Sequence, residues 1–159
     1  AEAKSGFPFL CVYTDGACSN NGRPNAKAGL GIYFGENDPR NVARKVGGKQ
    51  TNNVAELSAI IDTYPIIEHH LKQGKQVCIY SDSKYAIGCV TEYGKKMAQK
   101  NWKTTFPNKE LVQNAYEIYE NEKNVSFIHI KAHTKNTDQH SLGNAGADYL
   151  ANQAIGVAL

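Results

Sequence analysis

Long apolar runs, paired cysteine motifs, internal repeats and low-complexity tracts are all missing from this sequence of 159 residues. No apolar run approaches the roughly 18 residues of a membrane span, so a transmembrane protein is not expected. The opening residues, AEAKSG, are polar and lack the apolar centre of a secretion signal. We therefore expect residues 1–8 to be a flexible N-terminal segment, residues 9–159 to form one domain, and the protein to be intracellular, in the cytoplasm or nucleus.

Cysteine is sparse and shows no metal-binding pattern. The four cysteines form no CxxC pair and do not lie at zinc-ligand spacing from histidines. Three of them fall in apolar stretches, which favours packed, reduced thiols and a reducing compartment. They are Cys11, Cys18, Cys78 and Cys89.

Charge is nearly balanced, with a formal net charge of +3. A lysine-rich stretch at 95–109 is more informative, because Trp102 and Phe106 lie within it and Tyr93 just before it. One interpretation is a solvated helix face. The other is a surface that follows phosphates, with rings lying against sugars or bases.

Alternating strand and helix patterns cover most of the chain. Strands are predicted at 9–14, 28–34, 42–49, 76–80 and 125–130, and helices at about 51–71, after Ser83, at 110–122 and at 144–155. Turns are predicted at Asp15-Gly16 and at 35–41, and a polar loop at 133–143. The order βββ-α-β-α-α-β-α favours the α/β class: one mixed sheet, with its first three strands antiparallel and helices covering it.

Four acids stand at notable places in this pattern. Asp15 follows the first strand and Asp82 the fourth, Glu56 lies in the first turns of a helix, and Asp148 lies in the last helix. Each alone has an ordinary explanation as a turn former, a partner of the helix dipole or a surface acid. If strands one and four are neighbours, however, Asp15 and Asp82 approach each other. Their repulsion is relieved by a hard divalent ion such as Mg²⁺ or Mn²⁺.

Several segments together resemble the type 1 ribonuclease H family, from about residue 9 to 155. The segments that carry the resemblance are YTDGACSNNG (13–22), AGLGIYFG (28–35), QTNNVAELSAI (50–60), YSDSKYAI (80–87), NWK (101–103), IKAH (130–133) and GNAGADYLAN (143–152). The resemblance implies a ribonuclease H-like fold, with a five-stranded mixed sheet that includes three antiparallel strands and is flanked by helices. Residues 9–159 would be its catalytic domain.

The resemblance also implies an activity and its cofactors. It implies an endoribonuclease that hydrolyses the RNA strand of RNA–DNA hybrids with little sequence preference, leaving 5′-phosphate and 3′-hydroxyl ends. Two Mg²⁺ ions, with Mn²⁺ as a substitute, would be held by Asp15, Glu56, Asp82 and Asp148, with Asp15 bridging both. In the two-metal scheme one ion activates the attacking water and the other stabilises the leaving oxygen, so no protein nucleophile is required.

His133 matches the family's mobile-loop histidine, which implies proton transfer at the leaving group or help in product release. His140, in the same loop, is a rival for this role. The loop from His133 to Asp148 is longer than in many members of the family. We therefore expect Asp148 to be the least constrained of the four acids, because a long loop would let its helix shift.

Nine residues are implied substrate contacts. On the RNA side they are Cys18, Asn20, Asn21 and Asn52, and the metal ligand Glu56 is implied to contact the RNA strand in addition to these nine. On the DNA side, Lys49, Thr51 and Asn108 match a phosphate-binding pocket, and Tyr93 and Trp102 match the basic protrusion. Lys49 replaces the arginine of many relatives, which loses bidentate geometry. Trp102 is open to a second interpretation, as a packing residue.

Two alternatives remain: a hybrid-binding module without catalysis, and a nuclease of the integrase, transposase or resolvase kind with related acids. The four acids argue against the first, and the basic protrusion, TNN and KAH segments against the second. We expect binding to depend strongly on salt. We expect a monomer with no membrane and no obligate protein partner.

Overall fold

The computed structural model describes residues 9–157, so the expected flexible segment 1–8 lies outside the described residues. Five strands form one mixed sheet in the order β3-β2-β1-β4-β5. They are β1 (Phe9–Ser19), β2 (Lys27–Tyr33), β3 (Val42–Lys45), β4 (Gln76–Ser81) and β5 (Val125–His129). The pairs β1–β2 and β2–β3 are antiparallel, whereas β1–β4 and β4–β5 are parallel. The expected α/β class and strand topology are confirmed.

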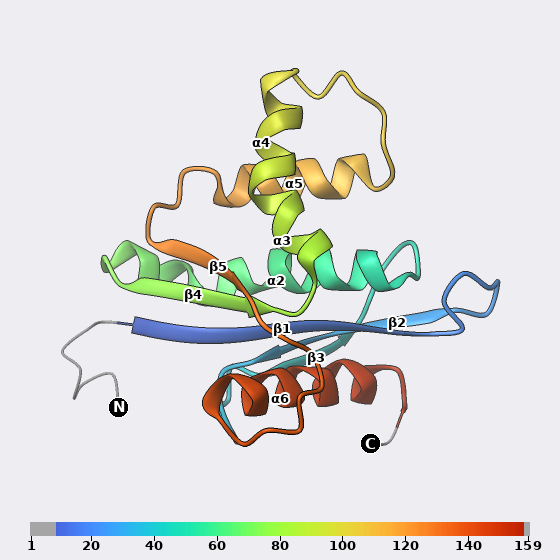
Figure 1. Cartoon of the computed structure of the whole chain (residues 1–159), viewed down its shortest axis with the longest axis vertical. Helices are drawn as coiled ribbons and strands as arrows, with labels where there is room; N and C mark the ends of the chain where they lie inside the picture. The colour runs from blue at the N-terminus through green and yellow to red at the C-terminus, as the bar shows by residue number, and fades with distance from the viewer. Residues whose placement is uncertain (1–8, 158–159) are drawn as a thin grey trace.

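Helices cover both faces of the sheet, and α6 lies alone on one of them (Figure 1). The helices are α2 (Asn52–Lys72), α3 (Lys84–Val90), α4 (Glu92–Gln99), α5 (Lys109–Tyr119) and α6 (Gln139–Ala154). The expectation of two helices between β4 and β5 is wrong, because three are present. Thr91 leaves helical geometry at φ −124°, ψ −104°, which separates α3 from α4. No helix within residues 9–157 is long and apolar enough to cross a membrane.

The main core lies between the sheet and α2. Val12 of β1 and Ile79 of β4 are completely buried, and so are Leu57 and Ile60 on α2. Burial of each such side chain contributes about 1.5–3 kcal/mol. Thr51 accepts a hydrogen bond from the backbone N–H of Val54 and caps α2, so the helix begins at Asn52. The start of α2 is therefore fixed relative to β1 and β4.

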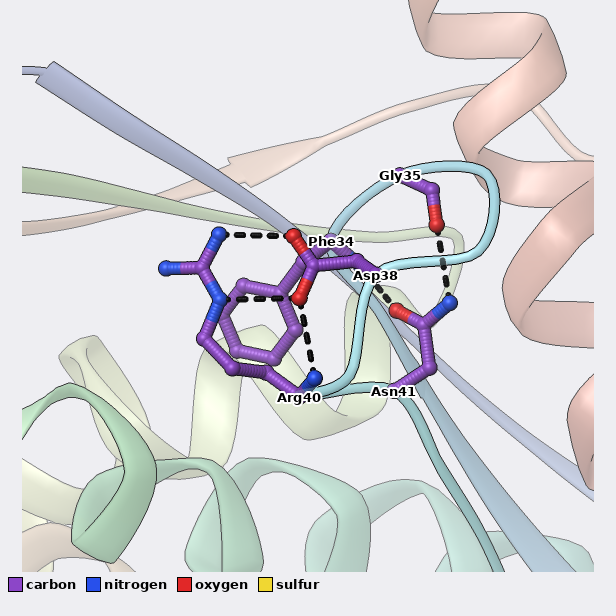
Figure 2. Close-up of polar contacts among 5 residues, drawn as sticks. All are labelled: Phe34, Gly35, Asp38, Arg40 and Asn41. Atoms are coloured by element: carbon purple, nitrogen blue, oxygen red, sulfur yellow. Dashed lines mark hydrogen bonds and ion pairs between the residues drawn. The ribbon is translucent and has the colours of Figure 1, made fainter.

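A tightly bonded turn joins β2 to β3, as expected for residues 35–41 (Figure 2). Asn41 accepts a hydrogen bond from the Phe34 backbone N–H at 2.7 Å and donates one to the Gly35 carbonyl at 2.8 Å. Arg40 donates to both carboxylate oxygens of Asp38, and its guanidinium lies 4.6 Å from the centre of the Phe34 ring. These contacts close the hairpin and fix the register of β2, on which α6 packs.

The end of the third strand and the start of the last helix were predicted wrongly. The third strand ends at Lys45 rather than at residue 49, because Gly48 has a φ of +78° and turns the chain away from β2. The last helix begins at Gln139 rather than at residue 144, because Asp138 caps it by accepting from the Ser141 backbone N–H. The polar loop before α6 is correspondingly shorter than the sequence indicated.

Candidate active site

Asp15 and Asp82 meet where the parallel pairing of β1 and β4 ends. The last parallel pair is Thr14 with Ser81, so Asp15 is the next residue of β1 and Asp82 is the residue that directly follows β4. The prediction that Asp15 lies in a turn is wrong, since β1 continues to Ser19 by pairing with β2 alone. Asp15 is only 3% exposed, and this burial reflects its position inside the strand. The predicted proximity of these two strands is confirmed.

Gly16 brings α2 against β1 and thereby places Glu56. A Cβ at Gly16 would lie 2.6 Å from the backbone nitrogen of Glu56 and 2.7 Å from the Cβ of Ala55. No side chain fits there, so the glycine is required by close packing rather than by the turn that the Asp-Gly pair indicated. The sequence did not indicate this packing role, although it singled out Gly16 as part of a predicted turn.

Three carboxylates form a compact cluster. Each of Asp15, Glu56 and Asp82 offers an oxygen, and these oxygens all lie within 4.8 Å of one another. Burial, followed by the charges of Glu56 and Asp82, raises the pKa of Asp15 far above its usual range. Burial and the charge of Asp82 likewise raise the pKa of Glu56. Glu56 Oε1 is buried and has no hydrogen-bond partner among residues 9–157. An all-oxygen set of clustered acids fits a hard divalent cation.

Asp148 approaches the cluster from α6. It lies outside the group of three, but it lines the same cavity of about 340 Å³ as Asp15, Glu56 and Asp82. Asn152, one helical turn further on, donates to Asp148 Oδ1 at 3.2 Å. The site thus draws its four acids from β1, from the residue that follows β4, and from α2 and α6.

The expected freedom of the helix that carries Asp148 is not what the structure shows. Gly31, the register partner of Asp15, lies against the α6 backbone, where an added Cβ would be 2.1 Å from the Ala147 carbonyl oxygen. A Cβ added at Gly29 would likewise be too close, at 2.5 Å from the Ala151 carbonyl oxygen. Backbone contact therefore fixes α6 on β2, whatever the length of the preceding loop.

Of the two candidate histidines, His133 lies at the acid cavity. It lines that cavity, is exposed, and adopts a left-handed φ of +51°. His140 instead joins Tyr13 through a hydrogen bond between its Nδ1 and the Tyr13 hydroxyl at 2.8 Å. The structure therefore separates the two histidines that the sequence left as rivals.

Asn144 connects His133 to the acid cluster. Its side-chain N–H donates to Asp82 Oδ2 at 3.0 Å, and its carbonyl oxygen accepts from the His133 backbone N–H at 3.4 Å. The side chain is almost fully buried. The sequence pointed to the segment GNAGAD but assigned Asn144 no role, because its two partners are distant along the chain.

The predicted RNA-side residues lie near the start of α2. Asn52 lines the acid cavity, and its backbone N–H donates to Asn21 Oδ1 at 3.2 Å. Asn20 is exposed and has a φ of +54°. Cys18 is half-buried on β1, and burial raises its pKa. Asn53 and Ser83 also line the cavity, and the sequence assigned them no part in a site.

The predicted DNA-side residues are divided between two other cavities. Lys49 and Asn108 line one of about 640 Å³, whereas Thr51 is engaged in capping α2 nearby. Tyr93 lines a second cavity, of about 400 Å³, together with Tyr85, which the sequence did not single out. Trp102 is half-buried against the rings of Phe106 and Tyr116, as the packing interpretation expects.

The metal-free protein is expected to lose stability as the pH rises. Asp15 and Glu56 have raised pKa values when folded but ordinary ones, about 3.9 and 4.3, when unfolded. At pH values between the unfolded and the folded pKa, the folded state binds more protons than the unfolded state. The free energy of unfolding therefore falls as the pH rises, by about 1.4 kcal/mol per pH unit for each extra proton that the folded state binds. Melting temperatures in EDTA should therefore fall from pH 5 to pH 8, and Mg²⁺ should reverse the loss at pH 8.

Asp15→Asn should flatten this pH dependence and stabilise the metal-free protein at pH 8. Asp62→Asn is a matched control, because Asp62 is an α2 acid paired with Arg44 at 2.6 Å, outside the cluster. An unchanged slope in Asp15→Asn would contradict the electrostatic argument.

Comparison with known proteins gives consistent matches. The sequence model of the RNase H family matches residues 9–156. Ribonuclease H1 of Homo sapiens is 33% identical over 150 residues, covering 91% of this chain and 49% of that protein. Ribonuclease H of Clostridium botulinum, strain Hall, is 32% identical over 151 residues, covering 92% of this chain and 95% of that protein.

A solved structure extends the similarity to three dimensions. LC9-RNase H1, described as a type 1 RNase H with the type 2 active-site motif, superposes with a TM-score of 0.70 at 27% identity. The match covers 94% of this chain and 73% of that one. The chain spans only about half of the human relative and 61% of a mimivirus relative.

Proposed function

Because this chain belongs to the type 1 ribonuclease H family, we propose that it hydrolyses the RNA strand of RNA–DNA hybrids. The observation that carries this proposal is the cluster of Asp15, Glu56 and Asp82, with carboxylate oxygens within 4.8 Å of one another. Asp148 and His133 line the same cavity, which is open to a polymeric substrate at the surface.

The four acids, Asp15 among them, would hold two divalent ions, with Mg²⁺ favoured. When bound, the ions would supply Lewis acidity for the attacking water and for the leaving oxygen. The acids would hold them in place, and Asn144 would keep the carboxylate of Asp82 oriented through its hydrogen bond. The products would carry 5′-phosphate and 3′-hydroxyl ends.

His133 would carry the proton transfer of this reaction. Its side chain is exposed at the cavity, where it would donate a proton to the leaving 3′ oxygen as the phosphodiester breaks. The hydrogen bond to Asn144 engages the backbone N–H of His133, at 3.4 Å, and leaves its imidazole available to the substrate.

The two strands of the hybrid would be distinguished on either side of the start of α2. Cys18, Asn20, Asn21 and Asn52 would lie along the RNA strand, where 2′-hydroxyl groups offer donors and acceptors. Lys49, Thr51 and Asn108 would hold a DNA phosphate, and Tyr93 would lie against a sugar or base. Such contacts go to the backbone, so cleavage would tolerate many sequences.

A single gel tests the proposal. Labelled RNA–DNA hybrid, double-stranded DNA and double-stranded RNA are each incubated with the protein in Mg²⁺ or in EDTA. We expect cleavage of the hybrid alone, in its RNA strand alone, and only with Mg²⁺. Cleavage of double-stranded DNA would instead favour the integrase or resolvase class. Activity that survives EDTA would contradict the metal-dependent mechanism.

A further inference from the structure

The first turn of α6 makes contacts that the proposed reaction does not use. α6 begins at Gln139, so its first turn precedes the buried Asn144. This turn follows directly on the loop that carries His133. Whatever fixes the turn also fixes one end of that loop.

His140 attaches this turn to the sheet. Its ring lies 4.4 Å from the centre of the Tyr80 ring, tilted by 33°, and 5.9 Å from that of Tyr13. The two tyrosines are stacked on each other at 4.9 Å, one from β1 and one from β4. The hydrogen bond between His140 Nδ1 and the Tyr13 hydroxyl also fixes the orientation of the His140 ring. An exposed side chain is thus held at a single place on the sheet.

The loop is bonded mainly to the same turn. The hydroxyls of Thr134 and Ser141 share a hydrogen bond, and the Ser141 hydroxyl donates to Asp138 Oδ1 at 2.7 Å. The Asn136 backbone N–H donates to the Thr134 hydroxyl at 3.3 Å. The position of the loop therefore depends on the position of Ser141, which is next to His140 in the sequence.

We propose that His140 is a positioning residue, which sets the place of His133 over the acid cavity by pinning the first turn of α6 to the Tyr13–Tyr80 pair. The proposal rests on the proposed function for the role of His133. A misplacement of a reacting group by about 1 Å can lower a rate by about 10²-fold, so a moderate shift of the loop has a measurable effect.

Single-turnover cleavage of the hybrid tests whether His140 acts through His133. His140→Ala should lower the rate about tenfold in the otherwise unchanged protein, with the hybrid Kd within about twofold, and by less than about twofold in a His133→Ala background. A merely structural role would lower the rate equally in both backgrounds, and that result would overturn the proposal.

Two further variants sharpen the comparison. His140→Phe keeps a ring on Tyr80 but lacks the nitrogen, so it should recover part of the rate lost in His140→Ala. Leu142→Ala is the matched control, because Leu142 lies in the same turn, is 53% exposed, and should leave the rate unchanged. A rate for His140→Phe no higher than that for His140→Ala would overturn the role of the stacked ring.

Amide hydrogen exchange provides a readout that does not need activity. The Leu142 backbone N–H donates to the Asp138 carbonyl at 3.0 Å, so its exchange reports opening of the turn. His140→Ala should speed exchange at Leu142 and in residues 133–138 about fivefold or more. Unchanged exchange would overturn the anchoring. If the unaltered protein fails to cleave the hybrid, the proposed function fails, whereas the exchange result still decides whether His140 holds the loop.

Discussion

Asp82→Asn is expected to lower the single-turnover rate of hybrid cleavage by about 10³-fold, equivalent to about 4 kcal/mol of transition-state stabilisation. The substitution preserves shape but removes the negative charge that a divalent ion needs beside Asp15 and Glu56. The hybrid Kd should stay within about threefold, since most proposed contacts to the nucleic acid lie elsewhere. Rapid-quench cleavage and fluorescence anisotropy measure the two quantities.

The control for this variant is Asp62→Asn, which removes an equal charge from an ion pair with Arg44 outside the cluster. Its rate should remain within about twofold of the unaltered protein, because exposed ion pairs contribute little. A near-normal rate for Asp82→Asn would show that the site has been placed wrongly, whatever the result for hybrid binding.

Gly31→Ala is expected to destabilise the protein by about 3 kcal/mol, because the new methyl group would overlap the α6 backbone. Its carbon would lie 2.1 Å from the Ala147 carbonyl oxygen and 2.7 Å from the Ala151 nitrogen. Neither backbone atom can rotate away, so α6 must move off the sheet. For a chain of this length the melting temperature should fall by about 6–12 °C.

Activity should fall with stability in this variant, because Gly31 pairs with Asp15 and touches the residue before Asp148. Gly88→Ala is the matched control for stability: Gly88 lies within α3 with nothing near its missing Cβ, so alanine should raise stability by up to about 1 kcal/mol. A melting temperature for Gly31→Ala equal to that of the unaltered protein would refute the close contact of α6 with β2.

The sequence predicted the strands that form the site better than their ends. The apolar runs before Asp15 and Asp82 indicated two buried strands, and their parallel pairing followed from the helix between them. The continuation of β1 to Ser19 was hidden, because Asp-Gly is a common turn pair. The pair lies inside a strand because β1 continues to pair with β2 there, and Gly16 is required by its close packing on Glu56.

The start of α6 was misjudged for a similar reason. Gly143 and Gly146 lie inside the helix, where glycine is unfavourable, and the sequence had placed Gly143 at the end of the preceding loop. In the structure they face aromatic rings: an added Cβ would lie 2.5 Å from the ring of Tyr13 and 2.7 Å from that of Tyr33. Tertiary packing overrode local preference, and the cap formed by Asp138 with Ser141 marks the true start.

The backbone contact between α6 and β2 also determines which parts of this protein can vary. Asp148 is placed by Gly29 and Gly31 rather than by the chain that leads into its helix. Insertions or deletions at 135–137 would therefore leave the four acids in place and change only how His133 is presented. The proposed metal binding and the proposed proton transfer would in this sense depend on separate parts of the chain, and the loop could be shortened or exchanged to tune turnover while the metal site is kept.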